Sequence, residues 1–324
     1  MKAAVISKAD QSPVFAEFET PIAGPGEELI SVRTSALSHF TKSRAAGAHY
    51  SASGGLPAVA GSDGVGLTQD GRRVYFVLPE APFGAMAELT RVSARHCIEL
   101  PSALDDITAA AIANPGMSAW AGLINRAQLK SGEIVLINGA TGIAGRLAIQ
   151  LAKHLGASKV IATGRDKAAL EELKALGADV VIPFSLADAN PKAAKDYENL
   201  LKEQFVEGID VVVDYLWGKS AEIAIAAIAK AVENARPVRF VQVGSMSGAE
   251  IALPGAALRS SAITLMGSGI KSIPLGGLLA AINHVFEAAG PANLQIATKS
   301  VPLCTVEENW NADSGKSRLV FTVE

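Results

Sequence analysis

The pattern of apolar and polar positions divides the chain into two kinds of sequence. Up to about residue 100, short apolar or alternating segments, such as residues 3–6 and 74–78, are separated by turns rich in glycine and proline. This pattern predicts an all-β module of barrel type. From about residue 131, short apolar runs alternate with segments of helical periodicity, which predicts buried strands with helices between them. The second part is therefore expected to be an α/β doubly wound parallel sheet.

The clearest strand–helix–strand unit opens with the apolar run at residues 134–137. Glycines spaced by three follow this run, and then comes a helix in which apolar residues recur every four positions up to residue 155. A second apolar run at residues 160–163 completes the unit. Such a unit directs backbone N–H groups and the positive end of a helix at the glycine turn, where an anion binds. The pattern predicts a dinucleotide site at Gly139, Ala140, Thr141, Gly142, Ile143 and Ala144, with Gly145 as the third glycine.

The residues after the second strand of this unit bear on the choice of dinucleotide. An acidic residue there binds the ribose 2′-hydroxyl of NAD, whereas an arginine accommodates the 2′-phosphate of NADP. The chain reads Gly164, Arg165, Asp166 and Lys167, and its two cations favour the phosphate. We therefore predict NADPH as the cofactor, with NADH as the open alternative, and we place Gly164, Arg165 and Lys167 at the phosphate. A competing interpretation makes Arg165 a solvated surface charge.

Composition narrows the classes of function. The chain has 324 residues, of which 49% are hydrophobic, enough for two domains with their own cores. Its net charge of −3 gives no sign of a nucleic-acid or membrane partner. The two cysteines, Cys97 and Cys304, are too few for a disulfide framework or a cysteine-rich zinc site. The N-terminus lacks a signal peptide and no run has membrane-spanning length, so we expect a cytoplasmic protein.

Several motifs recur in the order found in one known superfamily. They are Pro-Ala-Val-Ala-Gly-Ser-Asp-Gly-Val-Gly at residues 57–66, Gly-Ala-Met-Ala-Glu at residues 84–88, Pro-Gly-Met-Ser-Ala-Trp at residues 115–120, and the glycine turn with its helix. With them the chain resembles the medium-chain dehydrogenase/reductase superfamily, and within it the zinc-independent quinone oxidoreductases. The resemblance implies a homodimer whose subunits combine a GroES-like catalytic domain, residues 1–115 and 275–324, with a Rossmann domain, residues 116–274.

The resemblance also bears on metals. Zinc alcohol dehydrogenases of this superfamily hold the catalytic metal with a cysteine, a histidine and a second cysteine. The corresponding positions here are Ser38, Ser62 and Asn114, none of which is a good zinc ligand, so we predict no metal. Without a Lewis acid, hydride transfer is easiest to an electron-poor acceptor. A quinone or an α,β-unsaturated carbonyl qualifies, because the incoming negative charge delocalises onto an oxygen.

Further site residues follow from the resemblance. Backbone groups after the fifth and sixth strands of the Rossmann sheet are expected to hold the nicotinamide, and Ser118 is expected to face it. The corresponding residues after the strands are Val243, Gly244, Ser245 and Ser268. A hydroxyl near the acceptor oxygen could stabilise or protonate it, and our first candidate is Tyr50 and our second Ser38. A competing interpretation packs Tyr50 on the barrel as an ordinary loop tyrosine.

We therefore predict an NADPH-dependent, zinc-independent oxidoreductase that reduces quinones or α,β-unsaturated carbonyls by direct hydride transfer. Its expected partners are a small-molecule acceptor and a second copy of the chain. Two alternatives stay open: an NAD(P)-dependent dehydrogenase of small alcohols, and a nucleotide-binding protein with a structural or regulatory role. The sequence does not identify the physiological acceptor, because the shape of the substrate pocket depends on loops.

Overall fold

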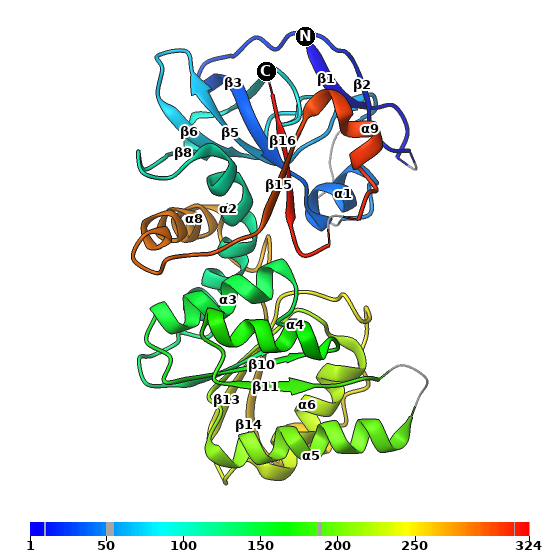
Figure 1. The fold of residues 1–324 in the computed structure, drawn as a ribbon, viewed down its shortest axis with the longest axis vertical. Coiled ribbons are helices and arrows are strands. Elements are labelled where there is room, and N and C mark those ends of the chain that lie inside the picture. The colour runs from blue at the N-terminus through cyan, green and yellow to red at the C-terminus, as the bar shows by residue number, and fades with distance from the viewer. Residues whose placement is uncertain (10, 50–54, 187–189, 314, 324) are drawn as a thin grey trace. The chain divides into compact units, whose positions relative to one another are not determined.

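A computed structural model describes residues 1–9, 11–49, 55–186, 190–313 and 315–323 (Figure 1). The chain divides into two compact units. The first comprises Met1–Asn114 together with Ile296–Glu324, and the second is Pro115–Gln295. Both ends of the chain therefore belong to the first unit.

The first unit is built from β-strands. Its larger sheet has the order β15-β16-β3-β5-β6-β8, with β7 also paired to β3, and its smaller sheet has the order β2-β1-β4. The strand β16 from the C-terminus pairs with β3 from the N-terminus, with Val320 opposite Ala36. The strands are β1 Lys2–Ile6, β2 Val14–Glu17, β3 Glu27–Ala36, β4 Ala58–Val59, β5 Asp63–Thr68, β6 Arg73–Val77, β7 Leu89–Ser93, β8 Cys97–Glu99, β15 Thr298–Pro302 and β16 Arg318–Thr322.

Apolar clusters form the core of the first unit, and two of them show how it is assembled. One lies between the strands of the larger sheet and includes Val74 and Phe76. The other joins the two chain ends, because Ala4 and Leu37 pack with Trp310 and Phe321. Short helices complete the unit: α1 His39–Ala45 and α9 Val306–Asn309. The pairing of β16 with β3 and this shared core explain why the last thirty residues fold with the first hundred.

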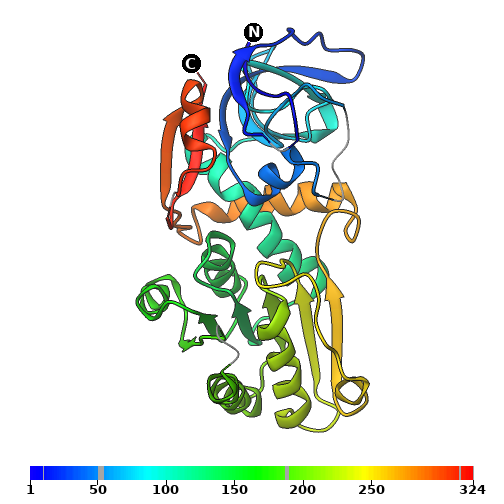
Figure 2. The ribbon, with the colours of Figure 1, turned by 90° about the vertical axis from the view of Figure 1, so that its right-hand side faces the viewer.

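The second unit is a doubly wound sheet. In the described part of the chain its strands are parallel and have the order β11-β10-β9-β12-β13-β14, so the predicted α/β fold class is confirmed. Figure 2 shows β13 and β14 side by side at one edge. The strands are β9 Ile134–Asn138, β10 Lys159–Gly164, β11 Val180–Pro183, β12 Val211–Asp214, β13 Pro237–Gln242 and β14 Ala262–Gly267.

Helices cover both faces of this sheet. On one face α5 and α6 contribute Tyr197, Phe205 and Ile225 to a large apolar cluster that includes Leu136 and Phe240 from the strands. On the other face α3 packs on β9 and β10, and the turn of π-helix η2 packs on β12 and β13. The helices are α3 Ile143–His154, α4 Lys167–Glu172, α5 Pro191–Glu207, α6 Gly218–Ala231, α7 Gly255–Arg259, α8 Leu275–Ala289 and η2 Ala121–Arg126.

The chain enters the second unit within a long apolar helix. Helix α2 spans Asp106–Trp120 and continues directly into η2. By length and composition alone, Asp106–Arg126 could cross a membrane, so the expectation that no run has membrane-spanning length is wrong for this helix. However, 61% of its apolar window is buried inside the protein. The helix therefore has the burial of a core helix.

The chain leaves the second unit later than residue 274, the predicted end of the Rossmann domain. Helix α8 belongs to the second unit, because Leu278 and Ala281 pack with Ala121 of η2 in one apolar cluster. The chain rejoins the first unit only at Ile296.

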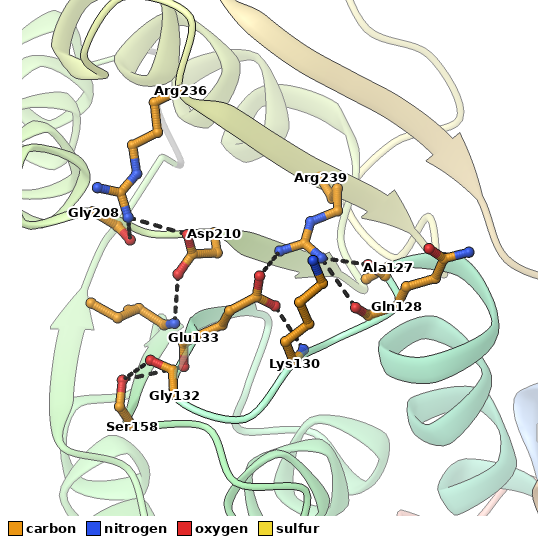
Figure 3. A network of polar contacts seen from close by, with 11 residues as sticks. Ala127, Gln128, Lys130, Gly132, Glu133, Ser158, Gly208, Asp210, Arg236 and Arg239 are labelled. Carbon is orange, nitrogen blue, oxygen red and sulfur yellow. Dashed lines mark hydrogen bonds and ion pairs between the residues drawn. The ribbon is translucent and has the colours of Figure 1, made fainter.

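A polar network closes the sheet at the amino-terminal ends of its strands (Figure 3). Arg239 of β13 donates to the carbonyl of Ala127 at 2.7 Å and pairs with Glu133 at 2.6 Å. The Asp210 carboxylate accepts the N–H of Ile134 at 2.9 Å and pairs with Arg236 at 3.1 Å. These bonds satisfy polar groups at the amino-terminal ends of the strands, whereas the glycine turn lies at their carboxyl ends.

Candidate dinucleotide site

The strand order identifies where this sheet binds a ligand. In open α/β sheets, ligands bind outside the carboxyl ends of the strands, at the point where the strand order reverses. Here that point lies between β9 and β12, whose last residues Asn138 and Asp214 are register partners. The glycine turn starts directly after Asn138, so the predicted cofactor residues and the switch point of the sheet coincide.

Two glycines of the turn are required by the fold itself. Gly139 has φ +84°, a conformation that L side chains rarely adopt, and a Cβ there would lie 2.8 Å from the Leu216 side chain. A Cβ on Gly145 would lie 2.6 Å from Cα of Ala140 and 2.7 Å from the carbonyl oxygen of Gly139. Gly145 therefore lets helix α3 pack directly on the turn.

Gly142 has no such role in the fold. Its φ of −74° suits any residue, and the nearest described atom to an added Cβ would be the Gly139 oxygen at 3.8 Å. Gly142 is the N-cap of the twelve-residue helix α3, and no described side chain caps that helix. The open backbone and the helix N-terminus together leave N–H groups that can approach a phosphate closely.

The end of β10 supplies cations beside the turn. A Cβ on Gly164 would lie 2.8 Å from the Thr141 side chain, so the two loops are in contact. The Asp166 carboxylate caps α4 by accepting the N–H of Ala169 at 3.1 Å. Arg165 and Lys167 are exposed, and neither forms an ion pair with a residue in the described ranges. They are available to a bound anion.

A buried polar network lies beneath the turn, and no sequence motif points to it. The Asn138 side chain donates to Asp214 at 2.7 Å and to Ser220 at 3.0 Å, and it accepts from Thr163 at 2.7 Å. The Tyr197 hydroxyl reaches the same Asn138 oxygen at 3.3 Å. The partners are 25 to 82 residues from Asn138 in sequence, so no local pattern reveals them. The network ties β9, β10, β12, α5 and α6 together around the site.

The residues predicted for the nicotinamide also lie at the carboxyl ends of the strands. The N–H groups of Val243 and Gly244 donate to the Asp214 carbonyl at 2.8 and 3.1 Å. The N–H of Ser268 donates to the carbonyl of Gln242 at 2.8 Å, and Ser245 is exposed. The Ser118 hydroxyl donates to the carbonyl of Pro115 at 2.9 Å. Ser118 therefore uses its proton within its own helix.

Tyr215 is a further residue at this edge, directly after β12. A Cβ on Gly244 would lie 2.7 Å from the Tyr215 carbonyl oxygen, so the two loops touch. Its hydroxyl is buried. Burial raises the pKa of this hydroxyl, and the nearby Ser118 side chain opposes the shift through hydrogen bonding. Sequence reasoning missed Tyr215 because one aromatic residue after a strand belongs to no motif.

The candidate catalytic residues belong to the first unit. Tyr50 lies outside the described residues. Ser38 is buried and caps helix α1: its oxygen accepts the N–H of Thr41 at 2.9 Å and lies 2.8 Å from the Thr41 hydroxyl. The described structure thus gives Ser38 a capping role.

The positions that correspond to the metal ligands hold no zinc-binding set. Ser62 is buried, Asn114 is half-buried, and neither serine hydroxyls nor amides are good zinc ligands. Within the described residues, no group of three or more His, Cys, Asp or Glu side chains is arranged to hold a metal ion. The donors present do not fit a catalytic zinc.

Two opposite charges, one of them next to Ser62, are buried in the first unit. Asp63 is 3% exposed and accepts a hydrogen bond from the Tyr75 hydroxyl at 2.9 Å. Burial raises the pKa of Asp63 to about 6, against the opposing attraction of Arg318, which is itself 6% exposed. The pair therefore places opposite charges from β5 and β16 inside the first unit.

A doubly wound sheet with an open glycine turn at its switch point is typical of a nucleotide-binding domain, and in this chain both ends form a separate unit. The family described as "Zinc-binding dehydrogenase" matches residues 144–276. A probable NADPH-dependent quinone reductase, tdiC of Emericella nidulans, is 26% identical over 96% of this chain and 96% of its own length. The 2-methylene-furan-3-one reductase of Solanum lycopersicum is 34% identical over 48% of this chain and 44% of its own.

Solved structures agree with this assignment at the level of the fold. The quinone oxidoreductase from Thermus thermophilus, also solved with NADPH, has a TM-score of 0.80 at 24% identity and covers 99% of this chain and 100% of its own. Together these comparisons support the medium-chain dehydrogenase/reductase superfamily, and the chain is similar to quinone oxidoreductases of that superfamily.

Proposed function

We propose that the protein is an NADPH-dependent, zinc-independent reductase of quinones or α,β-unsaturated carbonyls. The observation that carries the proposal is Gly142: the described fold has no need of a glycine there, and a dinucleotide phosphate does. Arg165 and Lys167, which pair with no described acid, support NADPH. The names of the relatives, an NADPH-dependent quinone reductase and a reductase of an enone, support the class of acceptor. The proposal includes the homodimer that the resemblance implies and the cytoplasmic location that the sequence patterns suggest.

The roles of the residues follow from their positions. Bound NADPH would supply the hydride. The backbone N–H groups at the start of α3 would hold its pyrophosphate, and Arg165 its 2′-phosphate. Groups after β13 and β14, at Val243, Gly244 and Ser268, would orient the nicotinamide. Because the donors at Ser38, Ser62 and Asn114 do not suit zinc, the acceptor must delocalise the incoming charge itself, and the protein contributes mainly alignment.

A test of activity measures the loss of NADPH absorbance with a panel of benzoquinones, naphthoquinones and simple enones. We expect turnover with at least one class, and slower turnover at low NADPH concentration in a Gly142→Ala variant run in parallel. NADPH binding without turnover on any acceptor would favour the non-catalytic alternative. Purification with tightly held zinc and oxidation of small alcohols would favour the alcohol dehydrogenase alternative.

The choice of cofactor is tested at Arg165. We expect Arg165→Glu to raise the Kd for NADPH about 100-fold, because it replaces a charge-assisted contact to the 2′-phosphate with repulsion. The Kd for NADH, which has no such phosphate, should change by less than about threefold. Arg259→Glu makes the same change of charge on α7 and serves as the control. Equal losses for both cofactors, measured by titration calorimetry, would show that Arg165 does not contact the phosphate.

A further inference from the structure

The turn after β12 carries two separate costs in stability. Trp217 has φ +57° and ψ −154°, a backbone region that is almost exclusive to glycine and strained for a bulky residue. Three residues earlier, the Asp214 carboxylate is fully buried, and burial raises its pKa to about 6. A turn with only a structural role avoids both costs by having glycine at position 217 and an apolar residue at position 214.

The two features are directly connected. One oxygen of Asp214 accepts the N–H of Leu216 at 3.0 Å, and the other accepts the N–H of Trp217 at 3.0 Å. The first oxygen also accepts the Asn138 amide at 2.7 Å, so the carboxylate joins the turn to the end of β9. Asp214 therefore folds the chain back sharply after β12 and holds Trp217 in its strained conformation.

This sharp turn places Leu216 on the glycine turn. The Leu216 side chain covers Gly139 so closely that a Cβ at position 139 would lie 2.8 Å from it. The Trp217 ring packs at an angle against Phe240, with ring centres 6.4 Å apart. Leu216 is thus the side chain that the strained turn brings to the switch point of the sheet, where a doubly wound fold binds its ligand.

We propose that Asp214 and the strained backbone of Trp217 are positioning residues for the cofactor. They hold the Leu216 side chain against Gly139, so that Leu216 and the glycine turn form a preorganised surface on which the dinucleotide binds. The inference rests on the proposed function for the identity of the ligand. Strain that persists at the ligand-binding end of a sheet, where the surroundings over-determine it, is typical of preorganised sites.

The first test concerns binding. Asp214→Asn can keep the oxygen that accepts from Asn138, from Leu216 and, at 3.2 Å, from Trp217, but it replaces the oxygen nearer to the Trp217 N–H with a donor. We therefore expect the Kd for NADPH to rise about tenfold. Asp210→Asn, the same change directly before the same strand, should leave the Kd unchanged. If wild type binds NADPH and Asp214→Asn binds it equally well, the positioning role is wrong. If Asp214→Asn does not fold, Leu216→Ala tests the same binding surface, and we expect it to raise the Kd for NADPH.

The second test concerns strain and needs no cofactor. Trp217→Gly and Trp217→Ala both remove the ring, but only glycine accepts a positive φ without strain. We expect Trp217→Gly to melt several degrees above Trp217→Ala. This difference should shrink in an Asp214→Asn background, because the hydrogen bonds that hold the turn to residue 214 are weakened there. An equal difference in both backgrounds would show that Asp214 does not impose the strain. If wild type fails to bind NADPH, the proposed function is wrong. The melting temperatures still decide whether Asp214 holds Trp217 in its strained conformation.

Discussion

Gly142→Ala is expected to raise the Kd for NADPH at least tenfold while the protein stays folded. The added methyl group meets no described atom closer than 3.8 Å, and φ −74° is allowed for alanine. Its cost to the fold is the loss of a glycine N-cap, on the order of 1 kcal/mol, or about 3 °C in melting temperature. A phosphate held by the backbone would meet the methyl group directly, and one lost charge-assisted hydrogen bond is worth about 1.5–3 kcal/mol.

Gly145→Ala is the matched control, since it is the same substitution three residues later. Its methyl group would lie 2.6 Å from Cα of Ala140, so backbone must move, and we expect a loss of about 1–3 kcal/mol in the free energy of unfolding. Thermal unfolding and NADPH titration of both variants separate the two roles. If Gly142→Ala destabilises the protein as much as Gly145→Ala, or binds NADPH normally, then Gly142 does not face a phosphate.

The glycine turn shows how far the sequence reaches. The apolar run, the glycine spacing and the helical period predict the turn and its place after β9, because each depends on residues close together in the chain. Which glycine serves the fold and which is open to a ligand depends on Leu216 and Ala140, whose positions only the folded structure gives. The doubly wound order of the sheet could likewise be predicted, since it follows from the alternation of strands and helices.

Other features could not be predicted, for the same physical reason. Asp214 ends an apolar run and looks like any acid after a strand, and its partner Asn138 is 76 residues away. The placement of α8 in the second unit depends on its contact with η2, and an apolar helix face has the same pattern whichever unit it covers. Ser38 was predicted as a hydroxyl for chemistry, yet it is followed three residues later by Thr41, whose N–H it caps.

Arg318 lies in the first unit and was singled out by no pattern, yet its replacement should have the largest effect on stability. Arg318→Met leaves the buried Asp63 carboxylate with only the weaker attraction of Arg44. Removing one of two compensating buried charges costs up to about 3–5 kcal/mol, whereas replacing both is often nearly neutral. The Nε and one terminal nitrogen of Arg318 have no hydrogen-bond partner in the described ranges, so the guanidinium contributes mainly through its charge.

Combining Arg318→Met with Asp63→Asn should therefore recover part of the lost stability, because the new amide is neutral and can still hydrogen-bond the Tyr75 hydroxyl. Urea unfolding of the two single variants and of the double variant forms a thermodynamic cycle, and we expect the double variant to be more stable than Arg318→Met alone. Arg73→Met, which removes a half-exposed arginine paired with Asp106 in the same unit, is the control, with a loss of about 1 kcal/mol. Additive losses in the cycle would mean that Arg318 stabilises the first unit through packing and not through the charge of Asp63.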